Sequence, residues 1–268
     1  MLKAHLFFLS LVLVSSTSLA KDVSIAVASN FAAPMKLLSQ QFNEKQKYQT
    51  RLSFASSGKL YAQIRHGAPF DLYFSADQAI PSKLLREELA LPDSQFTYAL
   101  GALVLLSSNP KIKANQESLK KNQFNKLAIA NPRLAPYGFA AQQVLHQLGQ
   151  AKPLQKKIVK GENIAQVFQF VTSGNADFGF IAGSQIAKYK MQSNYTAWPV
   201  PSELHDPIRQ DAVLLARAEN NRAAHAFLNY MKSQPAREII RQFGYDLPEQ
   251  DVSTANAQYE HRQTSNKN

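Results

Sequence analysis

Apolar and polar positions follow two rhythms along the chain from about residue 22 onwards. Short apolar runs typical of strands alternate with amphipathic stretches typical of helices; in chain order the first six are "DVSIAVASN", "FAAPMKLLSQQFNEKQ", "YQTRLSFAS", "SGKLYAQIRHG", "FDLYFSAD" and "PSKLLREELA". In the first helical stretch Met35, Leu38 and Phe42 recur at three- and four-residue spacing, which marks the face that packs on a sheet. This order predicts an α/β fold with a mostly parallel sheet.

A second set of strands and helices begins after residue 100. Its strand-like runs are "ALVLLSS", "KLAIANP", "QKKIVKGEN", "ADFGFIAG" and "YTAWPVP", with helical stretches over about 138–148 and at "IAQVFQFVTSG". A Pro-rich stretch then leads to one more strand and two helices. We therefore predict that the chain crosses near 98–104 and near 200–208 between two lobes: lobe 1, from 21–100 and 204–247, and lobe 2, from 101–203.

The two ends of the chain depart from this pattern. Residues 1–20 carry an early Lys3, an apolar run over 6–14 and a small-x-small site at 18–20, which together indicate a secretory signal peptide. The apolar run is shorter than the ~20 residues that a membrane-spanning helix needs. Residues 248–268 are polar and aperiodic, which predicts a disordered tail. We therefore expect an exported, periplasmic protein.

Composition removes several classes of function. The chain has no cysteine, which excludes disulfides, thiolate catalysis, zinc–thiolate sites and lipid attachment at a leader cysteine. Its formal net charge of +11 should attract anions, but the basic residues are scattered and the leader indicates export, so we expect no nucleic-acid partner. The histidines lack metal-ligand spacing, and we interpret Asp71 and Asp77 as caps and hinge contacts. We predict no cofactor.

Three junctions share one arrangement, in which a strand ends, small or amide residues follow, and a helix begins. They are Ala28-Ser29-Asn30, Ser56-Ser57-Gly58 and Gly161-Glu162-Asn163. Free N–H groups at a helix N-terminus form a site for an anion, and such junctions lie where ligands gather in α/β sheets. Ser and Asn are also preferred helix N-caps, so spacing alone leaves capping and binding both open.

Four blocks of the sequence resemble the signature blocks of the periplasmic molybdate-binding proteins of ABC importers, in the type II periplasmic binding protein superfamily. They are "AVASNFAAPMKLLSQQF", "FASSGKLYAQIRHGAPFDLYFSAD", "ANPRLAPYGFAAQQVLHQLG" and "GENIAQVFQFVTSGNADFGFIAGSQI". The resemblance covers nearly all of the chain between leader and tail, and the second block is its most specific part. It implies a two-lobed periplasmic-binding-protein fold, each lobe a mostly parallel sheet flanked by helices, with the ligand in the cleft between lobes.

The resemblance also implies a set of ligand-binding residues. Ser29 and Ser57 would each donate through the hydroxyl and the backbone N–H, and Tyr137 and Ile164 would donate backbone N–H groups from the second lobe. Molybdenum would be present only inside the bound oxyanion, with no direct metal ligand from the protein.

One position departs from the family pattern. Where some members carry a ligand-contacting Tyr in a "Y-G-S" run, this chain has Ala182-Gly183-Ser184. Either Asn163, Asn30 or the Tyr137 hydroxyl replaces that donor, or the oxyanion makes fewer hydrogen bonds.

The resemblance predicts a monomeric solute-binding protein, not an enzyme, that captures molybdate or tungstate and delivers it to the membrane permease of an ABC importer. Neutral donors suit a fully deprotonated dianion, whereas monohydrogen phosphate carries a proton that needs an acceptor. Two alternatives stay open: a binding protein for another small oxyanion such as sulfate or phosphate, and an exported α/β hydrolase. The run "IAGSQIA" resembles a nucleophile elbow but lacks the second Gly of G-x-S-x-G.

Overall fold

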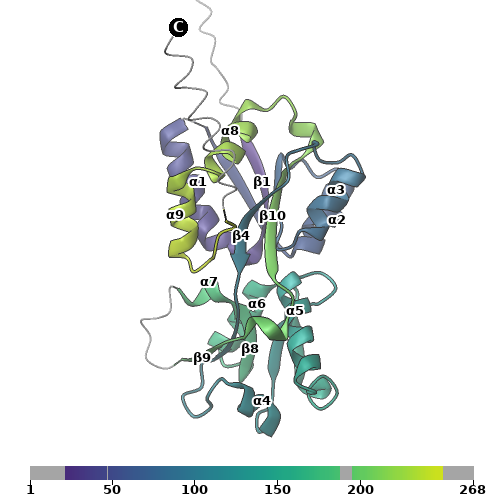
Figure 1. Cartoon of the computed structure of the whole chain (residues 1–268), viewed down its shortest axis with the longest axis vertical. Coiled ribbons are helices and arrows are strands. Elements are labelled where there is room, and N and C mark those ends of the chain that lie inside the picture. Colours follow the sequence, from purple (N-terminus) through teal and green to yellow (C-terminus); the bar gives the residue numbers. More distant parts are fainter. Residues whose placement is uncertain (1–21, 47, 188–194, 250–268) are drawn as a thin grey trace, which may run out of the picture.

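Two five-stranded sheets, one above the other in Figure 1, organise the protein. The computed structural model describes residues 22–46, 48–187 and 195–249. The predicted signal peptide (1–20) and all but the first two residues of the predicted tail (248–268) lie outside the described residues. No helix within the described ranges has the length and apolar character needed to cross a membrane.

The first sheet defines lobe 1 and has the strand order β2-β1-β3-β10-β4. Its strands are β1 (Val23–Ala28), β2 (Thr50–Ala55), β3 (Leu72–Phe74), β4 (Phe96–Gly101) and β10 (Ile208–Leu214). One face packs against α1 (Ala32–Gln46), α8 (Arg222–Met231) and α9 (Gln234–Gln242), and the other against α2 (Ser57–Arg65) and α3 (Ala79–Arg86).

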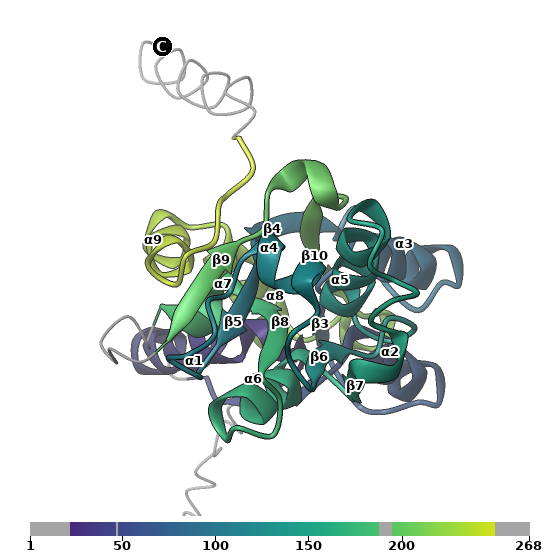
Figure 2. The ribbon, with the colours of Figure 1, turned by 90° about the horizontal axis from the view of Figure 1, so that it is seen from below.

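The second sheet defines lobe 2 and has the strand order β7-β6-β8-β5-β9. Its strands are β5 (Leu103–Ser107), β6 (Leu127–Ala130), β7 (Ile158–Gly161), β8 (Phe178–Ala182) and β9 (Thr196–Pro199). Its helices are α4 (Gln116–Lys121), α5 (Pro136–Gln147), α6 (Ile164–Thr172) and the short α7 (Gly183–Ile186). Seen from the free end of this lobe, α5 and α6 lie on opposite sides of the sheet (Figure 2).

Both sheets are mostly parallel, as the sequence predicts, but each is mixed because one described strand runs against the others. β1 is parallel to β2 and β3, but β10 is antiparallel to β3 and β4. In lobe 2, β6 is parallel to β7 and β8, while β5 is antiparallel to β8 and β9. The reason is topological, because β5 and β10 each enter their sheet directly from the other lobe and therefore run against the strands they join.

The core follows the predicted periodicities. Met35, Leu38 and Phe42 are at most 1% exposed and pack on the sheet with Ile25 and Val27, so the predicted core face of the first helix is confirmed. Ala26, between those two strand residues, lies in the cluster on the opposite face of the sheet, as the two-residue period of a strand requires. This packing holds the ends of β1 and β2, and the helices that follow them, at the edge of lobe 1 that faces lobe 2.

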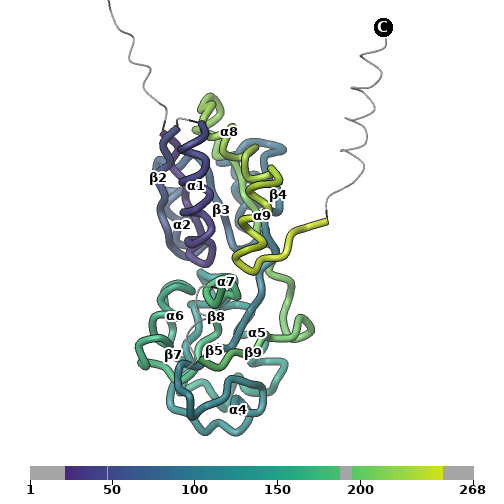
Figure 3. Tube along the Cα trace, turned by 90° about the vertical axis from the view of Figure 1, so that its left-hand side faces the viewer, coloured from purple at the N-terminus to yellow at the C-terminus, as the bar shows by residue number. Residues whose placement is uncertain are grey.

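Two connections join the lobes. The first runs from β4 to β5 through Gly101 and Ala102, and the second from β9 to β10 through residues 200–207. The C-terminal segment lies beside the first connection, because Leu100 and Asp246 exchange backbone hydrogen bonds of 2.8 and 3.1 Å. Figure 3 shows lobe 1 above lobe 2, with α6 and α7 at the end of lobe 2 that faces lobe 1.

Candidate anion site between the lobes

Four helices begin where the two lobes face each other. In lobe 1 a short 3-10 turn (Ser29–Phe31) leads from β1 into α1, and α2 follows β2. In lobe 2, α5 follows β6 and α6 follows β7. The first N–H groups of a helix have no partner inside the helix and carry partial positive charge. The facing ends of the lobes therefore offer several backbone donors to a shared ligand.

A small cavity lies among these helix N-termini. Its volume is about 10 Å³, close to the space that one ordered water needs. Ten residues line it, all of them uncharged: Ala28, Ser29, Asn30, Ser56, Ser57, Ala76, Ala135, Pro136, Tyr137 and Ile164. Beside it the Gly58 N–H donates to the Leu134 carbonyl across the lobes at 2.9 Å, so the walls are already in contact.

Ser57 places a buried hydroxyl in the wall of the cavity. The residue is 1% exposed, and its Oγ accepts a hydrogen bond from the Ala76 N–H at 3.0 Å. Tyr73 donates its hydroxyl to the Ser57 carbonyl at 3.0 Å, which fixes the backbone. Ser57 is the first residue of α2 and Ser56 is its N-cap, so capping does not explain Ser57.

Ser56 is a lining residue that the sequence reasoning left out of the site. It is 4% exposed, and its Oγ is a buried atom without a hydrogen-bond partner among the described residues. Nor does its side chain cap α2. A buried hydroxyl without a partner costs about 1–3 kcal/mol, so its place in this cavity points to a ligand. The available signal was the pair of adjacent serines at the strand end.

Asn30 lies in the cavity wall with its side chain already engaged. Its Nδ2 donates to Gln210 Oε1 at 2.7 Å and to the Tyr245 hydroxyl at 3.0 Å, which uses both amide protons. The neighbouring Ser29 is 8% exposed, and its side chain makes no hydrogen bond within the described residues. Lobe 1 thus offers Ser29 together with the two serines of the α2 junction.

Lobe 2 contributes backbone donors. Pro136 and Tyr137 are the first two residues of α5, and Ile164 is the first residue of α6, so the N–H groups of Tyr137 and Ile164 belong to the unpaired first turn. Asn163 is the N-cap of α6, and its Oδ1 accepts from the Ala165 and Gln166 N–H groups at 2.9 and 3.1 Å. The structure therefore brings together Ser29, Asn30, Ser57, Tyr137 and Ile164, and places Asn163 behind them as a cap.

The position of the missing tyrosine lies outside the cavity lining. Ala182 is fully buried, and its N–H donates to Gln185 Oε1 at 3.0 Å. The Tyr137 hydroxyl accepts from Gln210 Nε2 at 3.2 Å, which holds the phenol against lobe 1. Since both Asn30 amide protons are in use and Asn163 does not line the cavity, the Ser56 hydroxyl is the lining donor that adds to those of Ser29 and Ser57.

Charged groups stand at the rim and in the lobes. Lys59 and Glu162 form an exposed ion pair of 3.5 Å that spans the two lobes beside the cavity.

Asp77 caps α3 by accepting from the Ile80 N–H at 2.8 Å, which confirms the capping interpretation. Burial, with a contribution from Asp211, raises the pKa of Asp77. Asp71 binds the Ser24 N–H and Arg217, both in lobe 1, so its interpretation as a hinge contact is wrong.

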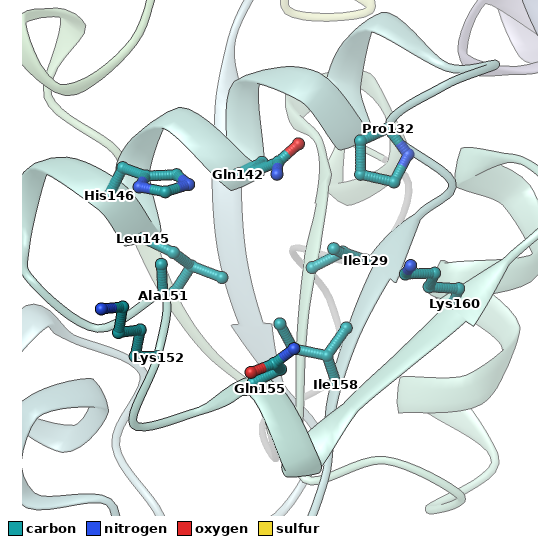
Figure 4. Close-up of a pocket in the computed structure, with 10 residues that line it drawn as sticks. All are labelled: Ile129, Pro132, Gln142, Leu145, His146, Ala151, Lys152, Gln155, Ile158 and Lys160. Carbon is teal, nitrogen blue, oxygen red and sulfur yellow. The ribbon is translucent and has the colours of Figure 1, made fainter.

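A larger hollow lies on lobe 2 between α5, β6 and β7. Its volume is about 780 Å³, and its walls are side chains of mixed character: Ile129, Pro132, Gln142, Leu145, His146, Ala151, Lys152, Gln155, Ile158 and Lys160 (Figure 4). Among the described helices of eight or more residues, none contributes its N-terminal residues to these walls. Within the same part of the chain, no group of three or more His, Cys, Asp or Glu side chains could hold a metal ion.

Two lobes joined by crossing strands, with a small cavity between facing helix N-termini, define the class of two-lobed solute-binding proteins. A family model described as bacterial extracellular solute-binding protein matches residues 23–246. The chain belongs to that family, whose members are binding proteins and not enzymes.

Individual relatives share most of their length with this chain. It is 44% identical to the molybdate-binding protein ModA of Azotobacter vinelandii, in an alignment that covers 88% of this chain and 94% of the relative. It is 42% identical to ModA of Rhodobacter capsulatus, in an alignment that covers 84% of this chain and 88% of the relative. The solved periplasmic molybdate-binding protein of Azotobacter vinelandii superposes with a TM-score of 0.81 at 38% identity, over 85% of this chain and all of that one. The sulfate-binding protein SubI of Mycobacterium tuberculosis shares the fold, with a TM-score of 0.69 at 15% identity over 89% and 91%.

Proposed function

We propose that this protein binds molybdate, or tungstate of the same shape and charge, between its two lobes. The observation that carries the proposal is the cavity itself, whose lining holds serine hydroxyls and helix N-terminal N–H groups but no charged side chain. Relatives at 44 and 42% identity are molybdate-binding proteins, which supports the same ligand here.

The proposed ligand contacts come from both lobes. Ser29 and Ser57 donate hydroxyl and backbone N–H groups, and Tyr137 and Ile164 donate backbone N–H groups from the opposite wall. We add Ser56, because its buried hydroxyl lacks a partner and lines the same cavity. Asn30 forms part of the wall, and Asn163 acts through α6, whose N-terminus it caps.

The chemistry of the lining favours a fully deprotonated dianion. Monohydrogen phosphate would bring a proton that needs an acceptor, and no carboxylate lines the cavity to supply one. Sulfate has the right charge but shorter bonds, so its rejection rests on the distance between the two walls. Molybdate and tungstate match in both respects and should bind alike.

The wider role follows from the family and from the predicted leader. We propose that the protein is exported to the periplasm, works as a monomer, and hands its oxyanion to the permease of an ABC importer. The solved relative is a periplasmic protein, which supports this location. The hydrolase alternative loses its candidate nucleophile, because Ser184 Oγ is buried and donates to the Asn30 carbonyl at 3.0 Å.

Isothermal titration with molybdate, tungstate, sulfate and phosphate tests the ligand. We expect comparable heats and affinities for the first two, weaker binding of sulfate and none of phosphate. At a hundredfold excess over Kd, a ligand of the native state adds about 2.7 kcal/mol of stability, so thermal unfolding should show the same ranking. Binding of phosphate as tight as that of molybdate would contradict the argument from the uncharged lining.

A further inference from the structure

A buried polar cluster joins the lobes behind the candidate anion site, at the strands that cross between them. We call it the hinge cluster. None of its six members is more than 4% exposed; they are Asn30, Tyr98, Tyr137, Ser184, Gln210 and Tyr245. Tyr137 and Ser184 belong to lobe 2 and the other four to lobe 1.

Three hydrogen-bonded contacts of the hinge cluster cross from one lobe to the other. Gln210 Nε2 donates to the Tyr137 hydroxyl at 3.2 Å, Ser184 Oγ donates to the Asn30 carbonyl at 3.0 Å, and the Tyr245 hydroxyl lies 3.0 Å from Ser184 Oγ. Because these atoms are on different lobes, a movement that separates the lobes here would break the contacts. In an open form these groups would form hydrogen bonds with water instead.

Gln210 stands at the centre of the cluster. Its Oε1 accepts from Asn30 Nδ2 at 2.7 Å and from the Tyr98 hydroxyl at 3.1 Å, while its Nε2 reaches Tyr137. Gln210 therefore holds one cavity residue from each lobe, Asn30 and Tyr137, yet does not line the cavity itself. The register of β10 against β4 shifts between Gln210 and Asp211, an irregularity of the kind that re-aims side chains.

Gly101, the last residue of β4 at the first connection between the lobes, leaves room for the hinge cluster. A Cβ at Gly101 would collide with the Tyr137 hydroxyl and with Gln210 Nε2, so any other residue there would force these two side chains to move. The phenols also stay neutral, because burial raises the pKa of Tyr245 to about 12 and the pKa of Tyr137 well above its ordinary value. The cluster thus keeps the same donors and acceptors across the physiological pH range.

We propose that the hinge cluster is a latch that stabilises the closed arrangement of the two lobes relative to the open one, with Gln210 and Tyr245 as positioning residues for the anion site. A net hydrogen bond between uncharged groups changes an equilibrium about three- to tenfold. Removing one hydroxyl of the latch should shift the ratio of open to closed molecules toward open by that factor. The part of the argument that concerns ligand affinity rests on the proposed function, whereas the closure itself does not.

Distance measurement between spin labels tests the latch without any ligand. The chain has no cysteine, so Gln40→Cys in α1 and Gln169→Cys in α6, both exposed, place one label on each lobe. In this background we compare the parent with Tyr245→Phe, Ser184→Ala and the double variant. Tyr245→Phe keeps the ring that packs against Phe31 at 5.3 Å and loses only the hydroxyl.

A matched control is available inside lobe 1. Tyr230 is a partly buried phenol whose hydroxyl donates to Gln41 Oε1 at 3.3 Å within the same lobe. We expect longer label distances in both single variants and no change in Tyr230→Phe. In the double variant the increase should be smaller than the sum of the two single increases, because Tyr245 and Ser184 share one contact. Unchanged distances in Tyr245→Phe and Ser184→Ala, or an equal change in Tyr230→Phe, would overturn the latch.

Molybdate kinetics form the second measurement. We expect Tyr245→Phe and Ser184→Ala to release molybdate about three- to tenfold faster, with Tyr230→Phe matching the parent. If the parent binds no molybdate, the proposed function fails, and the label distances still decide on the latch. If molybdate binds but leaves both variants at the parental rate while the distances lengthen, the positioning role is refuted and closure alone stands.

Discussion

The Ser56 hydroxyl allows a clean separation of binding from folding. Its Oγ has no partner within the described structure, so Ser56→Ala removes a buried polar atom without leaving any protein group unpaired. We therefore expect the free energy of unfolding to stay the same or to rise slightly. Ser57→Ala is different, because Ser57 Oγ accepts the Ala76 N–H, and its loss leaves that buried donor unpaired at a cost of about 1–3 kcal/mol in stability.

The effect of Ser56→Ala on binding follows from the charge of the ligand. A hydrogen bond to a charged group contributes about 1.5–3 kcal/mol, so the variant should bind molybdate roughly 10- to 150-fold more weakly. Titration calorimetry measures the affinity, and urea unfolding without ligand measures the stability. Ser39→Ala is the matched control, since Ser39 Oγ is also buried without a partner within the described residues but lies in the core of lobe 1.

Parental affinity in Ser56→Ala would refute the assignment of Ser56 as a ligand donor. A loss of affinity that appears equally in Ser39→Ala would show that burial of a hydroxyl, and not contact with the ligand, is responsible. A fall in stability of several kcal/mol in Ser56→Ala would mean that the hydroxyl has a structural partner after all.

Three further predictions follow from the site and its surroundings. Ala182→Tyr should weaken molybdate binding in a titration, because a ring at a fully buried position overfills the packing beneath the site; tighter binding would show an empty place for that donor. Molybdate affinity should change little between low and high sodium chloride, since no charged side chain lines the cavity, and a steep loss would implicate surface Lys or Arg. Burial raises the pKa of Asp77 in the folded state, so its contribution to stability is lost as pH rises from about 4 through that raised value; Asp77→Asn, which can still cap Ile80, should stabilise the protein more at pH 7 than at pH 4 in urea unfolding.

Much of the fold could be predicted because local patterns encode it. The spacing of Met35, Leu38 and Phe42 identified a core face, and the strand-end junctions at Ser29 and Ser57 lead into helices as expected. Strand direction could not be read in the same way. Nothing local to β10 says that it runs against β3 and β4, because that direction is set by the crossing from lobe 2.

The candidate site was predicted in outline, and its missing parts depend on tertiary hydrogen bonding. The sequence could not show that Ser57 accepts from Ala76 while Ser56 is left without a partner, because both are equally plausible at a helix start. Asn163 was a candidate ligand and is occupied as a cap. Gln210 and Tyr245 could not be connected to Asn30 at all, since some 180 and 215 residues separate them along the chain.

The position of β10 also determines the order in which the protein can be completed. In the first sheet β4 pairs only with β10 among the described strands, and β10 itself lies between β3 and β4. Lobe 2 uses a continuous stretch from β5 to β9, all of which precedes β10 along the chain. Lobe 1 is thus the last to be completed. Its strands β3 and β4 cannot join one sheet until β10, more than a hundred residues further along the chain, pairs between them. Such a long-range closure makes folding slow relative to a protein of local contacts, and it leaves the exposed edges of β3 and β4 as the surfaces that an unfinished chain must protect from aggregation.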